Sequence, residues 1–141
     1  MLKIITLILC LTYTTALFSE EKTYGDVTLS EIVSIYDGDT FTGTIKDWPT
    51  IIGYRISIRV AGIDCPEMRD KRPEIKAKAQ EAKQYVVKRL REAKEVRLIN
   101  IRRDKYFRIL ADISVDGKDL AKELIEKGLA KPYDGGTKEK W

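Results

Sequence analysis

With 141 residues, 43% of them hydrophobic and 34% charged, the chain has the length and composition of a single soluble globular domain. It contains no histidine, which excludes Ser-His and Cys-His nucleophiles, histidine general acids and most zinc sites. The net charge is +4, and any acid–base chemistry must use carboxylates, lysine, tyrosine, arginine or a metal-bound water.

The charged residues are unevenly distributed along the chain. Residues 20–68 carry 4 basic and 9 acidic side chains, a net of −5, whereas residues 69–108 carry 15 basic and 6 acidic ones, a net of +9. An acidic segment followed by a basic one suggests a metal site beside a surface that binds polyanions. The alternative is that much of the basic segment is one lysine-rich helix with a solvated face.

The chain begins with an apolar run that predicts a secretory signal peptide. A lysine precedes the run, which extends from Ile4 to about Ala16 and is followed by small and acidic residues. The run is too short for a membrane span. Cleavage after Ala16 or Ser19 fits, and we assign residues 1–19 to the signal peptide and 20–141 to the domain. We therefore expect a secreted or periplasmic protein; an uncleaved anchor or a buried N-terminal strand is the alternative.

The first half of the domain predicts three strands. Alternating apolar and polar residues around an Asp-Gly turn predict paired strands at about 27–36 and 40–46, followed by a loop at 47–53. Residues 54–63 also alternate, and the apolar set shares one face. We expect that face to point into the core and Arg59 to lie on the outer face, free to act on something else.

The second half predicts two helices and two strands. Apolar residues recur at three- and four-residue steps over 73–94, which indicates an amphipathic helix. Strands are expected at 95–101 and 107–115. A short helix over 119–128 has an aspartate as N-cap and ends at a glycine, and the tail after it is irregular.

The order β-β-β-α-β-β-α predicts an α+β fold that is mainly β. Short antiparallel strands with one helix between the third and fourth fit a small five-stranded barrel of the oligonucleotide-binding (OB) type with two helices. Such a fold favours binding of nucleic acids or oligosaccharides but specifies no reaction.

Three polar segments, "YDGDTFTG", "IRVAGIDCPEMR" and "RRDKYFR", stand out from this scaffold. Each segment alone is common, because Asp-Gly is a frequent turn signal and charged residues often surround turns. Together they supply the chemistry of phosphodiester hydrolysis without histidine.

The candidate residues divide into three roles. Asp39 and Asp64 offer hard oxygen ligands, and a backbone carbonyl near Cys65 could add another, which suits Ca²⁺ better than a soft metal. Arg59 and Arg108 carry forked, permanently charged donors suited to a phosphate. The remaining carboxylate, at position 67, could accept a proton from water.

With these residues in these positions, the sequence resembles the staphylococcal nuclease family from about Val27 to Tyr133. The resemblance is carried, in order, by Asp-Gly-Asp-Thr, Arg-x4-Asp-x-Pro-Glu, Asp-Lys-Tyr-x-Arg, and Gly-Leu-Ala after a helix. It implies an OB-fold-like barrel and a Ca²⁺-dependent hydrolase that cleaves DNA, RNA or both with little sequence specificity. It also implies that the products carry 3′-phosphate ends.

The resemblance implies a role for each matching residue. Asp39 and Asp64 match carboxylate ligands of Ca²⁺, Cys65 stands where a backbone carbonyl is a ligand, and Glu67 matches the proposed general base. Arg59 matches one of two arginines that bind the phosphate and stabilise the five-coordinate transition state.

The other four matches lie towards the C-terminus. Arg108 matches the second arginine, Lys105 a phosphate contact, and Tyr106 a tyrosine that stacks on a base or bonds a phosphate. Tyr133 lies near a second family tyrosine, with different local spacing. Phe107 and Ile109 flank Arg108 where the best-known member has glycines, so they could tilt the arginine or fill part of the nucleotide pocket.

The expected partner is single- or double-stranded nucleic acid as substrate, with no stable protein partner and a monomeric state. Two other functions compete with a nuclease. One is an OB-fold module that binds nucleic acid but has lost catalysis; the other is an extracellular Ca²⁺-binding interaction domain. The latter would explain the two aspartates but not the two arginines or Glu67.

Overall fold

A computed structural model describes residues 21–141. The predicted signal peptide, residues 1–19, lies outside the described residues. Within 21–141 the chain forms three helices and nine strands, and four of the strands have only two residues. The helices are α1 (Thr50–Gly53), α2 (Pro73–Glu92) and α3 (Leu120–Glu126). The strands are β1 (Val27–Thr28), β2 (Glu31–Ile35), β3 (Thr40–Thr44), β4 (Ile56–Val60), β5 (Ile63–Asp64), β6 (Val96–Arg103), β7 (Ile109–Val115), β8 (Lys118–Asp119) and β9 (Lys131–Pro132).

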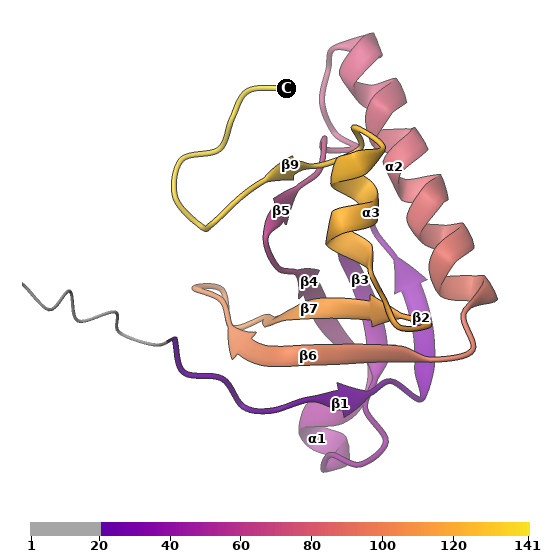
Figure 1. Cartoon of the computed structure of the whole chain (residues 1–141), viewed down its shortest axis with the longest axis vertical. Coiled ribbons are helices and arrows are strands. Elements are labelled where there is room, and N and C mark those ends of the chain that lie inside the picture. Colours follow the sequence, from indigo (N-terminus) through magenta and orange to yellow (C-terminus); the bar gives the residue numbers. More distant parts are fainter. Residues whose placement is uncertain (1–20) are drawn as a thin grey trace, which may run out of the picture.

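The main sheet is mixed and curves into a half-barrel (Figure 1). Its strand order is β1-β6-β7-β4-β3-β2, with β8 paired to β7, and a separate two-stranded sheet joins β5 to β9. Neighbouring strands are antiparallel except β4 and β7, which run parallel. The OB-like α+β fold expected from the sequence is confirmed, and its five strands of five or more residues are β2, β3, β4, β6 and β7.

The structure differs from the expectation in three details. The third predicted strand, 54–63, is divided into β4 and β5, and β5 pairs with β9 outside the main sheet. The first predicted strand, 27–36, is divided into β1 and β2, which pair with different neighbours, β6 and β3. The segment expected as a loop at 47–53 contains the single-turn helix α1. A one-turn helix cannot present an apolar period long enough to be recognised in the sequence.

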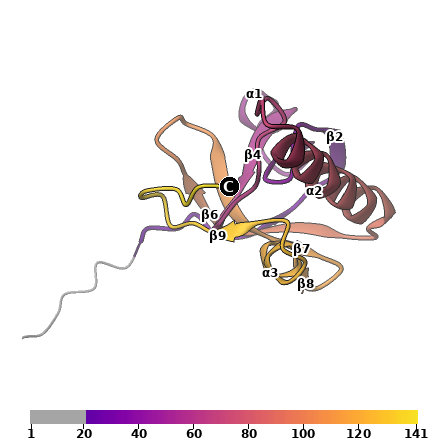
Figure 2. The ribbon, with the colours of Figure 1, turned by 90° about the horizontal axis from the view of Figure 1, so that it is seen from above.

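Helices α2 and α3 lie on one side of the molecule, opposite the β6–β7 loop (Figures 1 and 2). The buried face of α2 consists of Ala79, Ala82, Val86 and Leu90, which is the predicted apolar stripe. These side chains join a core formed mainly by the inward faces of the strands. The Asp119 side chain accepts a hydrogen bond from the backbone amide of Lys122, as an N-cap should.

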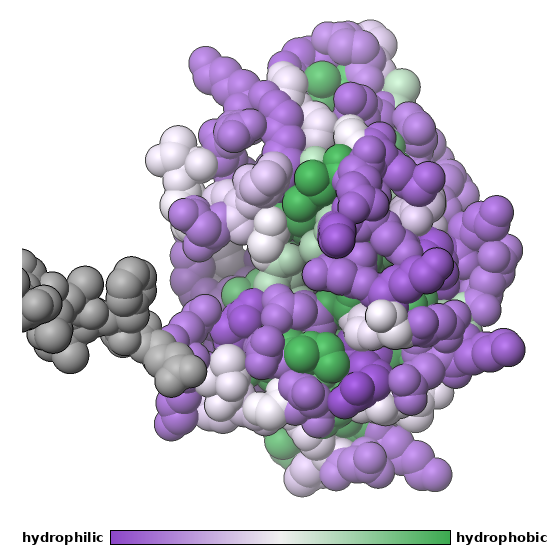
Figure 3. Space-filling view, viewed as in Figure 1, coloured by the Kyte–Doolittle hydropathy of each residue, from purple (hydrophilic) through white to green (hydrophobic). Residues whose placement is uncertain are grey.

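Most of the face drawn in Figure 3 is hydrophilic, and apolar side chains show only in small patches between charged ones. No helix in the described part of the chain is long and apolar enough to cross a membrane.

Strand pairing brings the polar motifs of the sequence together at one end of the sheet. Thr40 of β3 pairs with Arg59 of β4, and Arg59 lies beside Leu110 of β7. Asp39 immediately precedes Thr40, and Arg108 immediately precedes β7. Asp39 and Arg108 therefore lie at the end of the sheet where Arg59 is found. Asp64 of β5 pairs with Lys131 of β9, which brings the C-terminal tail to the same region.

Candidate functional site

A cleft of about 1080 Å³ opens where these strands end. Its walls come from the β2–β3 turn, β4, the segment around β5, the β6–β7 loop and the tail after β9. All nine residues selected from the sequence line it: Asp39, Arg59, Asp64, Cys65, Glu67, Lys105, Tyr106, Arg108 and Tyr133. Segments that are far apart in the sequence thus meet in one cavity.

The cleft also contains the buried charges of the protein. Among the described residues, the charged side chains classed as buried are Asp37, Asp39, Arg59 and Asp64, each at most 9% exposed. Removing a charge from water is costly, so such groups are rarely found in a core without a partner or a function. Their concentration here marks the cleft as the candidate site.

The Asp-Gly-Asp turn is held tightly against the core. The backbone amide of Asp39 donates a hydrogen bond of 3.1 Å to Asp37 Oδ1. A Cβ atom at Gly38 would lie 2.7 Å from Cys65 Sγ and 3.0 Å from Ala82 Cβ. Only glycine therefore lets the turn approach both the Cys65 segment and α2 this closely.

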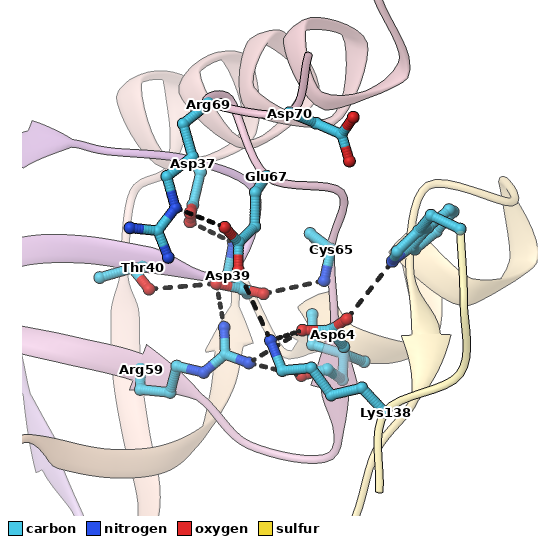
Figure 4. Close-up of polar contacts among 12 residues, drawn as sticks. Asp37, Asp39, Thr40, Arg59, Asp64, Cys65, Glu67, Arg69, Asp70 and Lys138 are labelled. Carbon is cyan, nitrogen blue, oxygen red and sulfur yellow. Dashed lines mark hydrogen bonds and ion pairs between the residues drawn. The ribbon is translucent and has the colours of Figure 1, made fainter. Parts of the chain in front are cut away.

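Asp39 joins three parts of the site (Figure 4). Its Oδ2 atom accepts a 2.8 Å hydrogen bond from the backbone amide of Cys65. Its Oδ1 atom accepts a 3.1 Å hydrogen bond from the hydroxyl of Thr40 and forms an ion pair with Arg59. The sequence match placed a metal ligand at the carbonyl of Cys65, and the amide of the same residue is what fixes Asp39.

Arg59 lies at the centre of the buried charges (Figure 4). Besides Asp39, its guanidinium donates a 3.1 Å hydrogen bond to the carbonyl of Ile63 and lies 3.6 Å from Asp64 Oδ1. Strand alternation correctly excluded Arg59 from the apolar face. The expectation that it would be free was wrong, because the carboxylates of neighbouring segments cover it.

The balance of charge in this cluster is negative. Three buried carboxyl groups, Asp37, Asp39 and Asp64, face one buried guanidinium, Arg59. Burial, followed by repulsion from Asp39, raises the pKa of Asp37 to about 7. Burial opposes the charge on Arg59, but Asp39 and Asp64 nevertheless raise its pKa. The cluster therefore has an excess of negative charge that an added cation would reduce.

Asp64, the last residue of β5, and Glu67, three residues further on, differ in exposure. The side chain of Asp64 is 7% exposed and that of Glu67 is 45% exposed. Glu67 forms a 2.6 Å ion pair with Arg69, whose side chain is 81% exposed. Such an exposed pair is weak, so Glu67 remains accessible to water. Between them lies Cys65, whose burial raises the pKa of its thiol and makes a thiolate nucleophile unfavourable.

The β6–β7 loop orients Arg108 through Asp104. The two carboxylate oxygens of Asp104 accept hydrogen bonds from the backbone amides of Tyr106 and Arg108 and, at 2.7 Å, from the Arg108 guanidinium. The guanidinium lies 5.5 Å from the centre of the Tyr106 ring, which is itself 67% exposed. Lys105 lies 5.2 Å from the same ring. The loop thus presents two cations around an exposed aromatic surface.

The two residues that flank Arg108 differ in burial. Ile109 is buried in the core, and Phe107 is 81% exposed and does not line the cleft. Phe107 has φ of 63°, a left-handed conformation that glycine would adopt at lower cost. Neither side chain fills the cleft, so the replacement of glycines leaves the space beside Arg108 open.

Two buried carboxylates on rigid strand ends fit a hard cation such as Ca²⁺. Oδ1 of Asp64 is buried and has no hydrogen-bond partner, although two cationic side chains lie near it. Within residues 21–141 no group of three or more His, Cys, Asp or Glu side chains is arranged to enclose a metal ion. An ion on Asp39 and Asp64 would therefore need further oxygen ligands from the backbone, water or a substrate.

Sequence reasoning missed four residues of the site. Asp37 and Asp104 belong to the recognised motifs, but the resemblance assigned roles only to neighbouring residues. Lys138 and Trp141 contact Asp64 from the irregular tail. Nothing in the local sequence pattern signals those two contacts, because they depend on where the tail folds back.

Comparison with known proteins identifies the family of the chain. The profile of the family described as staphylococcal nuclease homologue matches residues 57–140. The match includes the arginine, carboxylate and loop segments of the cleft and begins after the Asp-Gly-Asp turn. The chain belongs to this family.

Curated relatives carry names of the same kind. Probable endonuclease LCL3 of Pyricularia oryzae is 30% identical over 155 residues, covering 88% of this chain and 56% of that protein. Probable endonuclease C19F8.04c of Schizosaccharomyces pombe is 36% identical over 87 residues, covering 57% of this chain and 37% of that protein. The chain thus spans about half of the first relative and less of the second.

Proposed function

We propose that this protein is a nuclease that hydrolyses phosphodiester bonds of DNA, RNA or both. The observation that carries the proposal is the meeting of Asp39, Asp64, Arg59, Glu67 and Arg108 at one solvent-open cleft. Family membership and the names of the relatives support the same chemistry. We further propose that the protein acts as a monomer on single- or double-stranded substrates with little sequence specificity, since the cationic groups at the cleft suit the phosphate backbone.

The proposed metal is Ca²⁺, held by the carboxylates of Asp39 and Asp64 and by the backbone carbonyl of Cys65. The negative balance of the buried cluster supports this assignment. When bound, the ion supplies a Lewis acid that draws electrons from a phosphate oxygen.

In the proposed mechanism, Glu67 accepts a proton from a water molecule, and the oxygen of that water attacks phosphorus in line with the leaving O5′. The P–O5′ bond breaks, the leaving oxygen takes a proton from solvent, and the product ends in a 3′-phosphate. Arg59 and Arg108 neutralise the charge that grows on the other phosphate oxygens. Asp39 and Asp104 orient these two guanidinium groups before substrate binds, which lowers the cost of reorganisation. Lys105, Tyr106 and Tyr133 are proposed to hold the neighbouring nucleotides by charge and stacking.

The test is digestion of single-stranded DNA with Ca²⁺ or with a chelator, comparing the wild type with Glu67→Gln. Loss of the general base should lower the rate by about 10²–10⁴. Glu126→Gln makes the same chemical change at an exposed position on α3 outside the cleft and is the matched control. End-group analysis with a phosphatase checks the 3′-phosphate. Equal rates for Glu67→Gln and wild type would remove Glu67 from the mechanism.

The same experiment separates catalysis from binding alone. DNA binding without cleavage in Ca²⁺ by the wild type would favour the OB-fold binding module. If the protein bound Ca²⁺ but neither bound nor cleaved nucleic acid, the interaction domain would be favoured instead.

We also propose that the protein is exported to the periplasm or secreted. The proposal is supported by the apolar N-terminal run and the small residues that follow it. N-terminal sequencing of the protein recovered outside the cytoplasm should give a chain that begins after Ala16 or Ser19. Recovery with Met1 intact would contradict processing.

A further inference from the structure

The chain after β9 folds back over the candidate site. We call residues 134–141 the C-terminal strap. In Figure 1 this segment runs away from β9, turns and continues to the C-terminus near the segment that leads into α2. Asp134, Gly135 and Lys138 line the cleft together with Asp64 and Glu67. The strap is therefore a wall of the site.

Lys138 places its ammonium group among the acidic residues (Figure 4). Its Nζ atom lies 2.6 Å from Asp64 Oδ1 and 3.9 Å from Glu67 Oε1. Asp64 is the proposed metal ligand and Glu67 the proposed base. An intramolecular cation thus contacts both carboxylates.

Further contacts hold the strap in this position. The indole Nε1 of Trp141 donates a 3.3 Å hydrogen bond to Asp64 Oδ2, so the strap contacts both oxygens of that carboxylate. Arg72, just before α2, donates a 2.7 Å hydrogen bond to the carbonyl of Trp141. Lys131 of β9 donates to the carbonyl of Lys140, and its Nζ atom lies 4.8 Å from the centre of the indole ring.

The charge of the site explains why a cation is favoured there. Asp64 is buried, and its single buried cationic neighbour, Arg59, is shared with Asp39 at the shorter contact. The ammonium of Lys138 supplies the missing positive charge. The same oxygen would face a calcium ion, and a divalent ion in direct contact with it would strongly repel the Lys138 ammonium, which lies 2.6 Å from that oxygen. Lys138 and the ion are therefore alternatives.

We propose that the C-terminal strap is an autoinhibitory element whose Lys138 occupies the cation position, so that Ca²⁺ must displace the strap to bind. This inference rests on the proposed function, because it concerns the regulation of the same site. The apparent affinity for Ca²⁺ is then the intrinsic affinity multiplied by the fraction of molecules in which the strap is open.

The test measures Ca²⁺ binding by titration calorimetry, without any substrate. Lys138→Gln keeps a polar, unbranched side chain, one atom shorter, and removes its charge. If the strap is closed in about nine-tenths of the molecules, this variant should bind Ca²⁺ about tenfold more tightly than the wild type. Lys140→Gln removes the same charge from the same strap without touching the site, and should bind as the wild type does.

Trp141→Phe provides a second variant, since it removes the indole hydrogen bond to Asp64 and leaves Lys138 in place. It should tighten Ca²⁺ binding by a smaller factor. Thermal melting of each variant shows that it is folded. Equal affinity of wild type, Lys138→Gln and Trp141→Phe would overturn the strap while leaving the calcium site intact. If none of them bound Ca²⁺, the calcium step of the proposed function and the strap would both be wrong.

The indole NMR signals give an independent readout. The chain has two tryptophans, and Trp48 does not line the cleft. Saturating Ca²⁺ should shift the Nε1–H signal of Trp141 in the wild type, because its acceptor is taken by the ion, and should shift that of Trp48 little. An unchanged Trp141 signal at saturating Ca²⁺ would overturn displacement of the strap.

Discussion

Gly38 shows how one residue couples the site to the core. Its backbone lies between the Cys65 thiol and Ala82 of α2, and a Cβ atom would come within 2.7 Å of the sulfur. Both neighbours are buried in the core and cannot move away into solvent. The position of the aspartates on either side of Gly38 therefore depends on the absence of a side chain.

We expect Gly38→Ala to destabilise the protein by about 1–3 kcal/mol, because the added methyl group overpacks this contact. The measurement is the midpoint of urea unfolding. Combining it with Cys65→Ala removes the sulfur, so the double variant should lose less stability than the sum of the two single variants. Strict additivity would show that the sulfur contact does not cause the strain.

Arg59 shows what strand alternation predicts about a single residue and what it does not. Alternation in β4 assigns Arg59 to the face opposite Ile58 and Val60, and the structure agrees. Alternation says nothing about what lies over that face. Here the covering groups come from the β2–β3 turn and the segment around β5.

At the scale of elements, α2 and α3 are joined by a polar contact. Glu123 of α3 accepts hydrogen bonds from the Arg89 guanidinium at 2.7 Å and 3.0 Å and from the Tyr85 hydroxyl at 2.9 Å. The bond to Arg89 is the main reason why the pKa of Glu123 lies below its usual value. None of the three residues lines the cleft, so the contact tests stability separately from function.

This contact predicts a pH-dependent contribution to stability. A carboxyl whose pKa is lowered by folding stabilises the folded state above its unfolded pKa, and the contribution disappears as the pH falls through the folded pKa. Glu123→Gln should therefore cost about 1 kcal/mol at about pH 7 and less at about pH 3. Urea unfolding at both pH values provides the measurement.

Glu126→Gln is the control, because it removes an exposed carboxylate from the same helix. It should change the stability little at either pH. If Glu123→Gln cost as much at the lower pH as at the higher one, the ionised contact with Arg89 would not be its source.

At the scale of the whole molecule, folding brings the acidic and basic parts of the chain together. The acidic segment 20–68 contributes the buried carboxylates of the cleft. The basic segment 69–108 contributes the cationic residues of the β6–β7 loop, including Lys105 and Arg108. The floor of the cleft is thus acidic and one rim is basic. This is the arrangement that the charge distribution suggested, with the remainder of the basic segment exposed along α2.

We expect binding of single-stranded DNA to weaken steeply with salt. With three to five phosphate contacts, log K should fall against log salt concentration with a slope of about −2 to −3.5. Fluorescence anisotropy between about 50 and about 200 mM salt measures the slope, with Glu67→Gln as background to prevent cleavage. Lys105→Ala should make the slope shallower by about 0.7, whereas Lys118→Ala, on β8 outside the cleft, should not change it. A slope near zero for the parent would exclude binding dominated by phosphate contacts.

Much of this molecule could be deduced from the amino-acid order alone. Strand alternation and helical periodicity are local properties, and they correctly predicted the main strands, α2, α3 and the OB-like arrangement. The motifs carried nine candidate residues, and all nine line one cleft. Their catalytic and binding roles remain predictions.

Only the tertiary structure revealed how the charges of the site are arranged. The contacts that bury Asp37 and pair Arg59 with two aspartates join segments that are distant in the sequence. The strap is the clearest case, because Lys138 contacts a carboxylate 74 residues earlier in the chain, at position 64. No periodic pattern and no local motif in the sequence predicts such a contact. It is set by the path of the backbone after β9 and by the excess negative charge of the carboxylates that the backbone approaches.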